Sequence, residues 1–397
     1  MTQQKDAIVI GASLAGSATA YLLAQAGFRV TLVDGQAFPR RKACGEGLSQ
    51  LGYQYLKALG LWSDTLEAQA CPFYGYDIRF PGEPAICLER QTPKGYGISR
   101  STLDAHVLEL AIKHPNVRFL PERVSAVKKH NALWVANTTT EILTASHLVL
   151  ATGGGQNHLF KKPLDKISTP RRVGLAFWAT GTWQSTPQHV TIHNVDEGQI
   201  IFTTLSEGQV NVSMLLDHDK MTASSSDKLV AQARDLLQEM GFAETSTTKV
   251  KGCATIQHQT QRATEGVFLV GDAIERLDPI GGMGMTHALL SASILCESLQ
   301  RHGNNQPRAL RHYYQRHHKA VRPLRVISWL SYSLNVKRMR PPRLLMRWFP
   351  KLAQGLLSNL ERRVPTAPQL RTASPQACRP SMVASKNEFV PCEGPIL

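Results

Sequence analysis

The stretch that decides the fold is Ala7–Asp34, which reads AIVIGASLAGSATAYLLAQAGFRVTLVD. Its apolar run Ala7–Ile10 is too short for a free-standing helix and ends at a glycine, which predicts a buried β-strand. Ser17–Ala26 is rich in Ala and Leu and predicts a helix, and Phe28–Val33 predicts a second strand. The two strands are expected to be parallel, because a helix crosses between them. The stretch therefore predicts the start of an α/β fold.

The turn before this helix, Gly11–Gly16, has the spacing of a phosphate-binding loop, in which Gly11 allows a sharp turn and Gly16 allows close helix packing. The helix N-terminus offers free N–H groups and a dipole that suit a pyrophosphate. Ser13 replaces the usual middle glycine, and Asp34 is placed to accept hydrogen bonds from a ribose. The alternative is a helix N-terminus of an unrelated α/β protein. The predicted dinucleotide contacts are Gly11, Ser13, Leu14, Ala15, Gly16 and Asp34.

The composition indicates a globular protein with a basic excess. The 397 residues suffice for two or three domains, and 45 Lys and Arg against 30 Asp and Glu give a formal net charge of +15. The seven cysteines are scattered without a CxxC pair, which favours a reduced, cytoplasmic setting over a disulfide framework or a metal site. The first apolar run is broken by Gly11, so we expect no secretory signal. We expect no membrane-spanning segment either, because no stretch is long and apolar enough to span a bilayer.

The positive charge is concentrated near the C-terminus, because no Asp or Glu occurs from Ser298 to Leu360. We expect no nucleic-acid partner, since no binding motif and no array of aromatic residues accompanies the charge. The basic residues of the stretch are Arg301, Arg308, Arg311, Arg316, Lys319, Arg322, Arg325, Lys337, Arg338, Arg340, Arg343, Arg347 and Lys351.

A second glycine-rich stretch, Gly266–Leu299, reads GVFLVGDAIERLDPIGGMGMTHALLSASILCESL. Val267–Val270 predicts a buried strand, and a glycine-rich turn then opens an apolar helix. The Asp272 carboxylate can bind a ribityl hydroxyl, and the N–H groups of the turn can stabilise negative charge on a reduced flavin. The two motifs together provide for both ends of one FAD. The contacts predicted here are Asp272, Gly282, Met283, Gly284 and Met285.

These motifs, with Cys44-Gly45-Glu46-Gly47-Leu48 between them, resemble the group A flavoprotein monooxygenase superfamily, which includes geranylgeranyl reductases and flavin halogenases. The resemblance spans roughly residues 5 to 300 and implies a para-hydroxybenzoate-hydroxylase-like fold with non-covalent FAD. Cys44 lies near the flavin by this resemblance or is a buried structural cysteine, and no catalytic residue is assigned. Further FAD contacts are predicted at Arg41, Gly45, Arg100 and Val124.

The expected fold class is α/β, α+β overall, with a Rossmann-like FAD-binding domain, an inserted antiparallel-sheet substrate domain and a C-terminal helical region. Ser101 is expected to cap a helix, with Asp104 in the capping-box position. Pro307–Leu334 is expected to form one helix with a kink at Pro323, and Leu344–Leu360 a short amphipathic helix. The expected parts are a discontinuous FAD-binding domain (1–72, 98–170 and 257–300), a sheet domain (73–97 and 171–256), basic helices (301–363) and a disordered tail (364–397).

Strand-like composition recurs between the two motifs. Phe73–Phe80 and Ala85–Leu88 predict a strand pair around a turn, and the later strands predict an antiparallel layer over the substrate. The turn Thr152–Gly155 lacks the acidic residue of related hydroxylases, so it does not define how a nicotinamide is held. The other predicted strands are Val117–Leu120, Val124–Lys128, Leu133–Val135, Leu148–Ala151, Val173–Thr182, His189–His193, Gln199–Thr204 and Gln209–Leu216.

The tryptophan-containing signatures of halogenases and geranylgeranyl reductases are absent, since the corresponding segment is Gln199–Thr204. The resemblance therefore implies an NAD(P)H- and O2-dependent monooxygenase that hydroxylates an aromatic or polyketide-like small molecule through a flavin C4a-hydroperoxide. The first alternative is a flavin-dependent reductase of isoprenoid or other apolar double bonds. The second is a flavin-binding protein without enzymatic activity.

The basic region Arg301–Arg363 is expected to pack as helices against the FAD-binding domain. Its charge, beside the apolar side of Leu344–Leu360, predicts loose contact of a cytoplasmic enzyme with the inner face of an anionic membrane, or with an acidic carrier protein. Either partner could deliver a small apolar or aromatic substrate. The other interpretation is that the apolar side is buried against the body of the chain.

Overall fold

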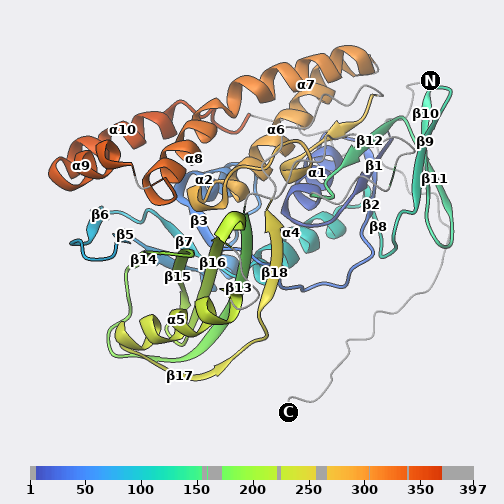
Figure 1. Ribbon diagram of the computed structural model, residues 1–397. Coiled ribbons are helices and arrows are strands. Elements are labelled where there is room, and N and C mark those ends of the chain that lie inside the picture. Colours follow the sequence, from blue (N-terminus) through green and yellow to red (C-terminus); the bar gives the residue numbers. More distant parts are fainter. Residues whose placement is uncertain are drawn as a thin grey trace.

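The computed structural model describes residues 6–153, 159, 172–220, 225–255, 266–303, 305–337 and 339–368. Figure 1 shows a parallel sheet with its helices, a large and mostly antiparallel sheet beside it, and a row of C-terminal helices across both. The mixed α/β class is as predicted. The predicted glycines at 154–155 and the predicted tail beyond 368 lie outside the described residues.

The five-stranded parallel sheet has the order β19-β12-β1-β2-β8, and helices α1, α4 and α6 pack beside it. The strand–helix–strand unit forms as predicted, with β1 and β2 parallel, although α1 begins three residues earlier than the sequence suggested. The bounds are β1 (Asp6–Ile10), α1 (Leu14–Gln25), β2 (Arg29–Val33), α4 (Arg100–Lys113), β8 (Val117–Leu120), β12 (His147–Leu150), β19 (Phe268–Leu269) and α6 (Gly284–His302).

Two glycines of the first turn are required by close packing. Gly11 has φ 102°, and a Cβ atom there would lie 2.6 Å from the carbonyl oxygen of Ala151. A Cβ atom at Gly16 would lie 1.7 Å from the carbonyl oxygen of Gly11, which no side chain can tolerate. The spacing of these two glycines therefore reflects the contact between α1 and the loop after β1.

The start of α4 differs from the prediction, because Ser99 and not Ser101 is the N-cap. The Ser99 hydroxyl accepts a hydrogen bond from the Thr102 N–H at 3.0 Å, and the helix begins at Arg100. Asp104 does not complete a capping box, since its carboxylate is paired with the Arg100 guanidinium at 2.8 Å.

The large sheet has the order β17-β13-β16-β15-β14-β5-β6, with β18 also paired to β13. It is antiparallel as predicted except between β14 and β5, which are parallel. Helix α5 packs on one face, where Ile200, Phe202 and Val212 contact Leu229 and Ala233. Because side chains alternate along a strand, the neighbouring residues point to the opposite face. The bounds are β5 (Gly75–Arg79), β6 (Ile86–Glu89), β13 (Arg172–Trp183), β14 (His189–Val195), β15 (Gly198–Ser206), β16 (Gln209–Asp217), α5 (Ser225–Glu239), β17 (Phe242–Thr247) and β18 (Lys251–Thr255).

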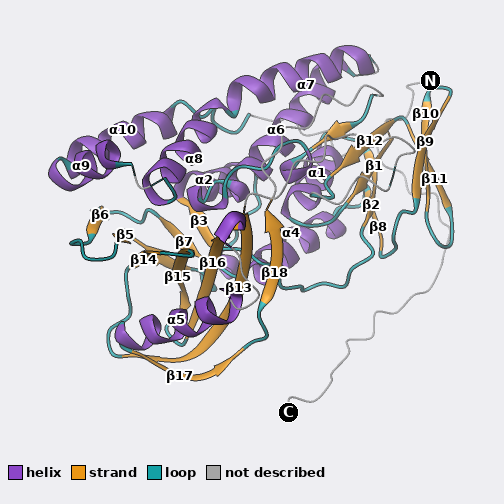
Figure 2. Ribbon diagram, in the orientation of Figure 1, coloured by secondary structure: helices purple, strands orange, loops and turns teal. Residues whose placement is uncertain are grey.

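Two smaller sheets, β3-β7-β4 and β11-β10-β9, complete the described fold, and Figure 2 distinguishes the strands and helices from the loops. The predicted strand Phe73–Phe80 is broken at Tyr74, so β4 and β5 belong to different sheets. The bounds are β3 (Gly47–Ser49), α2 (Gln50–Ala58), α3 (Asp64–Glu67), β4 (Cys71–Phe73), β7 (Gly95–Gly97), β9 (Ala126–His130), β10 (Leu133–Asn137) and β11 (Ile142–Ala145).

The C-terminal region forms four helices where two were predicted. The predicted kink at Pro323 is a full break, because this proline stands in the first turn of a new helix. Pro350 breaks the predicted helix Leu344–Leu360 in the same way, since proline is accommodated at a helix start and not inside. The bounds are α7 (Gln306–Ala320), α8 (Arg322–Asn335), α9 (Arg340–Trp348) and α10 (Pro350–Arg362).

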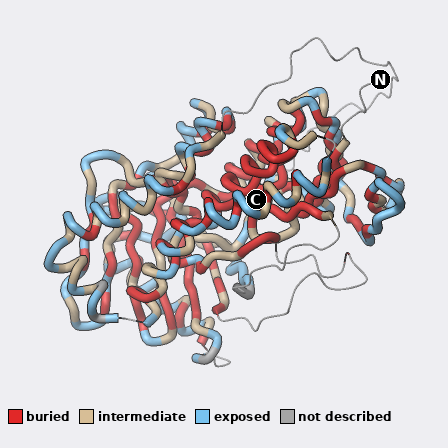
Figure 3. The backbone as a smooth tube through the Cα atoms, turned by 90° about the horizontal axis from the view of Figure 1, so that it is seen from above, coloured by how far each residue is buried: buried red, intermediate tan, exposed pale blue. Residues whose placement is uncertain are grey.

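The described chain stays packed beyond the last helix. Val364 is buried, and the Tyr55 hydroxyl donates a hydrogen bond to the Pro365 carbonyl. Order thus continues past residue 364, where the sequence predicted a disordered tail to begin. Figure 3 shows the buried residues running through the middle of the molecule, where α6 is buried along most of its length.

Candidate active site

A cavity of about 950 Å³ lies between the parallel sheet, the face of the large sheet opposite α5, and the C-terminal helices. Every FAD contact predicted from the sequence lines it except Gly16, which instead packs against Gly11. The lining residues among those predicted are Gly11, Ser13, Leu14, Ala15, Asp34, Arg41, Gly45, Arg100, Val124, Asp272, Gly282, Met283, Gly284 and Met285.

The end of the cavity beside β1 and β2 has the donors that a dinucleotide requires. Ser13 is the N-cap residue of α1, but its side chain makes no cap hydrogen bond, so the helix start is left for an anionic ligand. The Asp34 carboxylate accepts a hydrogen bond from the Ala12 N–H at 2.8 Å. Arg40 joins these residues, donating to the Ser13 hydroxyl at 2.8 Å and to Asp34 at 3.0 Å.

Sequence reasoning missed Arg40. It lies in the basic segment Phe38–Lys42, in which Arg41 was the residue predicted to contact the cofactor. Its guanidinium also stacks on the Phe38 ring, with 4.4 Å between Cζ and the ring centroid. The sequence did contain a signal for this contact, because Arg40, Arg41 and Lys42 follow one another in a short loop close to the predicted phosphate-binding turn.

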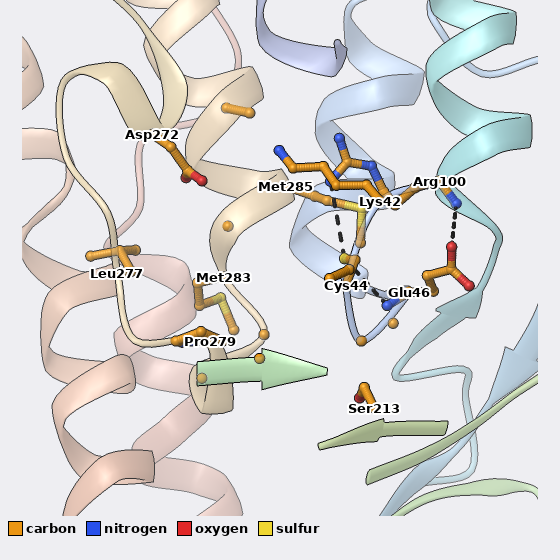
Figure 4. A pocket seen from close by; sticks show the side chains of 18 of the residues that line it. Lys42, Cys44, Glu46, Arg100, Ser213, Asp272, Leu277, Pro279, Met283 and Met285 are labelled. Carbon is orange, nitrogen blue, oxygen red and sulfur yellow. Dashed lines mark hydrogen bonds between the residues drawn. The ribbon is translucent and has the colours of Figure 1, made fainter. Parts of the chain in front are cut away.

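The Cys44–Gly47 loop forms the opposite side of the cavity. In Figure 4, Cys44, Glu46 and Arg100 face Asp272 and Met283 across the pocket. The Glu46 carboxylate accepts hydrogen bonds from the Arg100 N–H at 2.8 Å and from the Trp178 indole N–H at 2.7 Å. Burial raises the pKa of Glu46 to about 7.

Two predicted cofactor-binding arginines are already engaged with the protein. The Arg100 guanidinium is held by Asp104 at 2.8 and 3.0 Å, so only part of it is free toward the cavity. Arg41 lies over the Trp178 ring at 4.5 Å and donates a hydrogen bond to the Lys249 carbonyl. Burial lowers the pKa of Arg41. These contacts position the loop from both sides.

The second glycine-rich turn presents another open helix start. Gly282 has φ 65°, and a Cβ atom added to either Gly282 or Gly284 would meet no described atom within 4 Å. Met283, the N-cap residue of α6, makes no side-chain cap hydrogen bond. The turn therefore leaves backbone N–H groups and space for a planar, electron-rich ring.

A buried ion pair fixes this turn to the large sheet. Asp278 accepts hydrogen bonds from Arg172 at 2.9 Å and from the Ile280 N–H at 3.0 Å. Arg172 is 2% exposed and also lies 3.3 Å from Asp217. Burial raises the pKa of Asp278, while the Arg172 charge opposes the shift. No sequence signal linked Arg172 to Asp278, since they are far apart in the chain.

The rest of the cavity is a chamber between the large sheet and the C-terminal helices, where many lining side chains are apolar but Arg90, Lys94, Ser331, Asn335, Gln354 and Glu361 also line the cavity. Its polar side chains include Thr203 and Ser213, which lie beside the Cys44–Gly47 loop. The apolar lining residues are Ile78, Leu88, Val190, Ile192, Ile201 and Leu215 of the sheet and Ile327, Leu330, Leu334, Met346 and Leu357 of the helices.

Among the described residues, two groups of side chains have the residue types of metal ligands. Glu275, His287 and His317 are buried together, but the two histidine Nε2 atoms are hydrogen-bonded at 2.9 Å and Arg325 holds the Glu275 carboxylate. These contacts account for the group as a structural network. The other group, Asp77, Cys87 and His189, projects from β5, β6 and β14 on the face away from the cavity.

This fold and this cavity define an FAD-dependent oxidoreductase. The chain belongs to the FAD-binding domain family, whose sequence profile matches residues 4–114 and 171–325. The match includes both glycine-rich motifs and the large sheet, and it confirms FAD as the cofactor.

Two curated relatives are a reductase and a monooxygenase. The chain is 46% identical over 67 residues to a menaquinone reductase of Mycolicibacterium smegmatis, covering 16% of each chain. It is 25% identical over 317 residues to squalene monooxygenase SE1 of Panax ginseng, covering 75% of this chain and 58% of that one. The chain thus spans less than two thirds of the length of these two relatives.

Among solved structures, the flavin-dependent brominase Bmp2 shares the fold. The TM-score is 0.75 at 16% sequence identity, covering 90% of this chain and 94% of the brominase. At this identity the similarity establishes the fold alone. Within the described part of the chain, none of the helices has the length and apolar character needed to cross a membrane.

Proposed function

We propose that this chain is an NAD(P)H- and O2-dependent FAD monooxygenase that hydroxylates an aromatic or polyketide-like small molecule. The observation that carries the proposal is one continuous cavity, whose lining passes from Ser13 and Asp34 to Met283 and then to the apolar wall at Ile201. Cofactor and substrate would share this space. Bound FAD would accept a hydride from NAD(P)H and, once reduced, activate O2.

The residues along the cavity fit the parts of FAD in order. The start of α1 and Arg40 would hold the pyrophosphate, and Asp34 would accept hydrogen bonds from the ribose. Asp272 would bind the ribityl chain, and the turn Gly282–Met285 would stabilise negative charge at the flavin pyrimidine.

The contribution of the chain to the reaction is orientation and exclusion of water. The side chains that the large sheet presents to the chamber are mainly aliphatic, so few water molecules would compete with a substrate on that side. Glu46 holds the Cys44–Gly47 loop against Trp178 and the start of α4, which fixes one side of the cofactor space. Oxygen transfer of this type requires no nucleophilic side chain, in agreement with the absence of an assigned catalytic residue.

A reductase of isoprenoid or other apolar double bonds is the second candidate. It is favoured by the 46% identity to the menaquinone reductase and by Cys44 at the cavity wall. The two activities differ in their use of oxygen, because only the monooxygenase incorporates an oxygen atom into its product.

An anaerobic experiment separates the candidates. The holoprotein is mixed with NADH or NADPH and a candidate substrate without O2, and flavin reduction is followed by loss of visible absorbance. Oxygen is then added and its consumption is compared with product formed. Consumption in proportion to product supports the monooxygenase, and product formed before O2 supports the reductase. Failure of every donor to reduce the flavin would favour a protein without enzymatic activity.

We also propose that the outer side of α9 and α10 holds the enzyme at an anionic membrane surface. The inner side is packed, with Ala353 buried and Leu360 against the core, whereas Trp348 is 69% and Phe349 61% exposed. Lys351 is exposed beside these aromatic side chains. Amphipathic helices with this arrangement bind in the interface of anionic bilayers.

Vesicle co-sedimentation tests this surface with a matched control. Trp348→Ser/Phe349→Ser should abolish retention on anionic vesicles at low salt, while Ile142→Ser, an equally exposed change on β11, should not. Figure 1 shows α9 and β11 at opposite ends of the molecule. Membrane contact would be contradicted if all variants were retained equally or if the wild type were not retained. Binding to an acidic carrier protein without binding to vesicles would show that the partner is a protein.

A further inference from the structure

One edge of the large sheet carries three metal-ligand residue types on its outer face. Asp77 on β5, Cys87 on β6 and His189 on β14 come from neighbouring strands, which Figure 1 shows side by side. One donor atom of each residue lies within 4.8 Å of the other two. The cavity is lined by Ile78 and Leu88, which follow Asp77 and Cys87 in the chain, so the group is on the opposite face of the sheet.

Gly75 allows the three side chains to converge. It is paired with His189 where β5 and β14 run parallel, and a Cβ atom at Gly75 would lie 3.1 Å from His189 Cδ2. Because this position has no side chain, the imidazole can lie across β5 toward β6. The His189 Nδ1 atom is thereby 3.1 Å from Asp77 Oδ1 and 3.9 Å from Cys87 Sγ.

These separations are close to those that one zinc ion requires. Zn²⁺ binds sulfur at about 2.3 Å and nitrogen or oxygen at about 2.0–2.2 Å, so two ligands of a tetrahedral ion lie roughly 3.3–3.6 Å apart. The separations of 3.1 and 3.9 Å lie on either side of this range, so small side-chain rotations would bring the donors onto one ion. A set of one sulfur, one nitrogen and one oxygen suits Zn²⁺, whereas Mg²⁺ prefers oxygen alone.

Glu89 provides a carboxylate beside the other nitrogen of the imidazole. Its Oε1 atom lies 3.8 Å from His189 Nε2, and its side chain is 63% exposed, so it can rotate to accept the Nε2–H. A carboxylate in this position favours the tautomer in which Nδ1 carries no proton and can bind a metal. The arrangement is therefore that of a metal-binding histidine with an outer carboxylate.

The charge of the group also favours a cation. Among the described residues, the ion pairs of Asp77 and Glu89 are both with His189, whereas Arg325 holds the carboxylate of the buried Glu275 group. Burial and the two nearby carboxylates raise the pKa of Cys87 to about 11, so its thiol keeps the proton unless a cation displaces it. Cys87 is exposed, so an ion can reach it from solvent.

We propose that Asp77 Oδ1, Cys87 Sγ and His189 Nδ1 bind one Zn²⁺ ion, with a water molecule in the fourth position. The Cys87 thiol releases its proton to solvent, and the resulting thiolate forms the bond to zinc, so no oxidant or reductant is needed. The ion would join three strands across the parallel pairing of β5 and β14, behind the cavity wall. Zinc binding here is independent of the flavin reaction.

The test measures zinc binding to the FAD-loaded protein after treatment with EDTA. Zn²⁺ is added in competition with a fluorescent zinc chelator. Wild type should bind one ion per chain, and excess Mg²⁺ should not displace it. Loss of an outer carboxylate typically costs roughly 10–100-fold in metal affinity, so Glu89→Gln should lose about tenfold, and Cys87→Ser and His189→Ala, which each remove a ligand, at least about a hundredfold.

Cys71→Ser is the matched control, because Cys71 is another free cysteine but belongs to the small sheet β3-β7-β4. It should bind zinc as wild type does. X-ray absorption at the zinc edge should show one sulfur at about 2.3 Å in wild type and none in Cys87→Ser. No zinc bound by wild type, equal affinity in all variants, or a zinc shell without sulfur would overturn the inference.

Discussion

The Glu46 carboxylate and the Trp178 indole are hydrogen-bonded at 2.7 Å, and this contact joins the Cys44–Gly47 loop to strand β13 of the large sheet. The same carboxylate accepts the Arg100 N–H, so one side chain links the cofactor loop, the sheet and the start of α4. Glu46 has φ 55°, a left-handed backbone conformation that is unusual for a residue with a side chain. We infer that these hydrogen bonds hold the loop in this shape.

We predict that Glu46 makes the stability of the protein depend on pH. Burial raises its pKa to about 7 in the folded state, above its value in the unfolded chain. The unfolded state therefore releases the proton first, and the free energy of unfolding falls as pH rises from about 4.5 to 7. The contribution is at most on the order of 3 kcal/mol. Chemical unfolding of wild type and Glu46→Gln at pH 5 and pH 7.5 measures it.

Glu46→Gln will also lower the absolute stability, because the amide has one acceptor oxygen where the carboxylate offers a separate oxygen to each N–H group. The readout is therefore the change in the free energy of unfolding between the two pH values. Glu46→Gln should show a smaller difference between the two pH values than wild type. The same difference in both proteins would mean that Glu46 does not titrate in this range.

Arg40→Ala is expected to weaken FAD binding by roughly ten- to a hundredfold, since charged hydrogen bonds are each worth about 1.5–3 kcal/mol. The variant removes the link between Ser13 and Asp34 and a positive charge at the predicted pyrophosphate site. The dissociation constant is measured by adding FAD to the apoprotein and following flavin fluorescence. Arg29→Ala, which removes an exposed pair with Asp6, is the control and should bind FAD normally.

Asp272→Ala should also weaken FAD binding, by about ten- to a hundredfold, without unfolding the chain. Its carboxylate lines the cavity, and its described ion pair is a long one, 3.7 Å from Arg276. The circular dichroism spectrum and the dissociation constant for FAD are compared with those of wild type. A folded variant with unchanged affinity would reject the assignment of Asp272 to the cofactor.

Arg172→Met should destabilise the fold by about 3–5 kcal/mol, because it leaves the buried Asp278 carboxylate without its cation. Urea unfolding measures the change. Arg172→Met/Asp278→Asn removes both charges and should recover part of the lost stability. If the double variant is as unstable as the sum of both single variants, the two residues are not energetically coupled.

The sequence predicted the elements whose causes are local. Gly16 is required by its contact with the Gly11 carbonyl within one turn, and the spacing of the two glycines inside a strand–helix–strand pattern located the dinucleotide-binding unit. The strand-like composition of the segments that form β15 and β16 likewise predicted that they belong to an antiparallel sheet. Where two local signals competed, the prediction was wrong, since Ser99 and Ser101 are equally good caps and the pair Arg100–Asp104 decides between them.

The contacts that shape the site could not be predicted, because they join distant parts of the chain. Arg172 reaches Asp278, and Trp178 reaches Glu46, only after the large sheet has packed on the FAD-binding unit. The group of Asp77, Cys87 and His189 is equally invisible in the sequence, since His189 lies far along the chain from the other two. The alternation of residues along a strand predicts which face of the sheet a side chain is on, but not which other part of the chain packs against that face.

Isotopic labelling tests the proposed monooxygenase activity most directly. The holoprotein, NADPH or NADH and a candidate aromatic or polyketide-like substrate are incubated under ¹⁸O2, and the product is analysed by mass spectrometry. We predict a hydroxylated product that carries one ¹⁸O atom, formed in proportion to the O2 consumed. A product without ¹⁸O, or NAD(P)H oxidised with hydrogen peroxide as the sole outcome, would contradict the account.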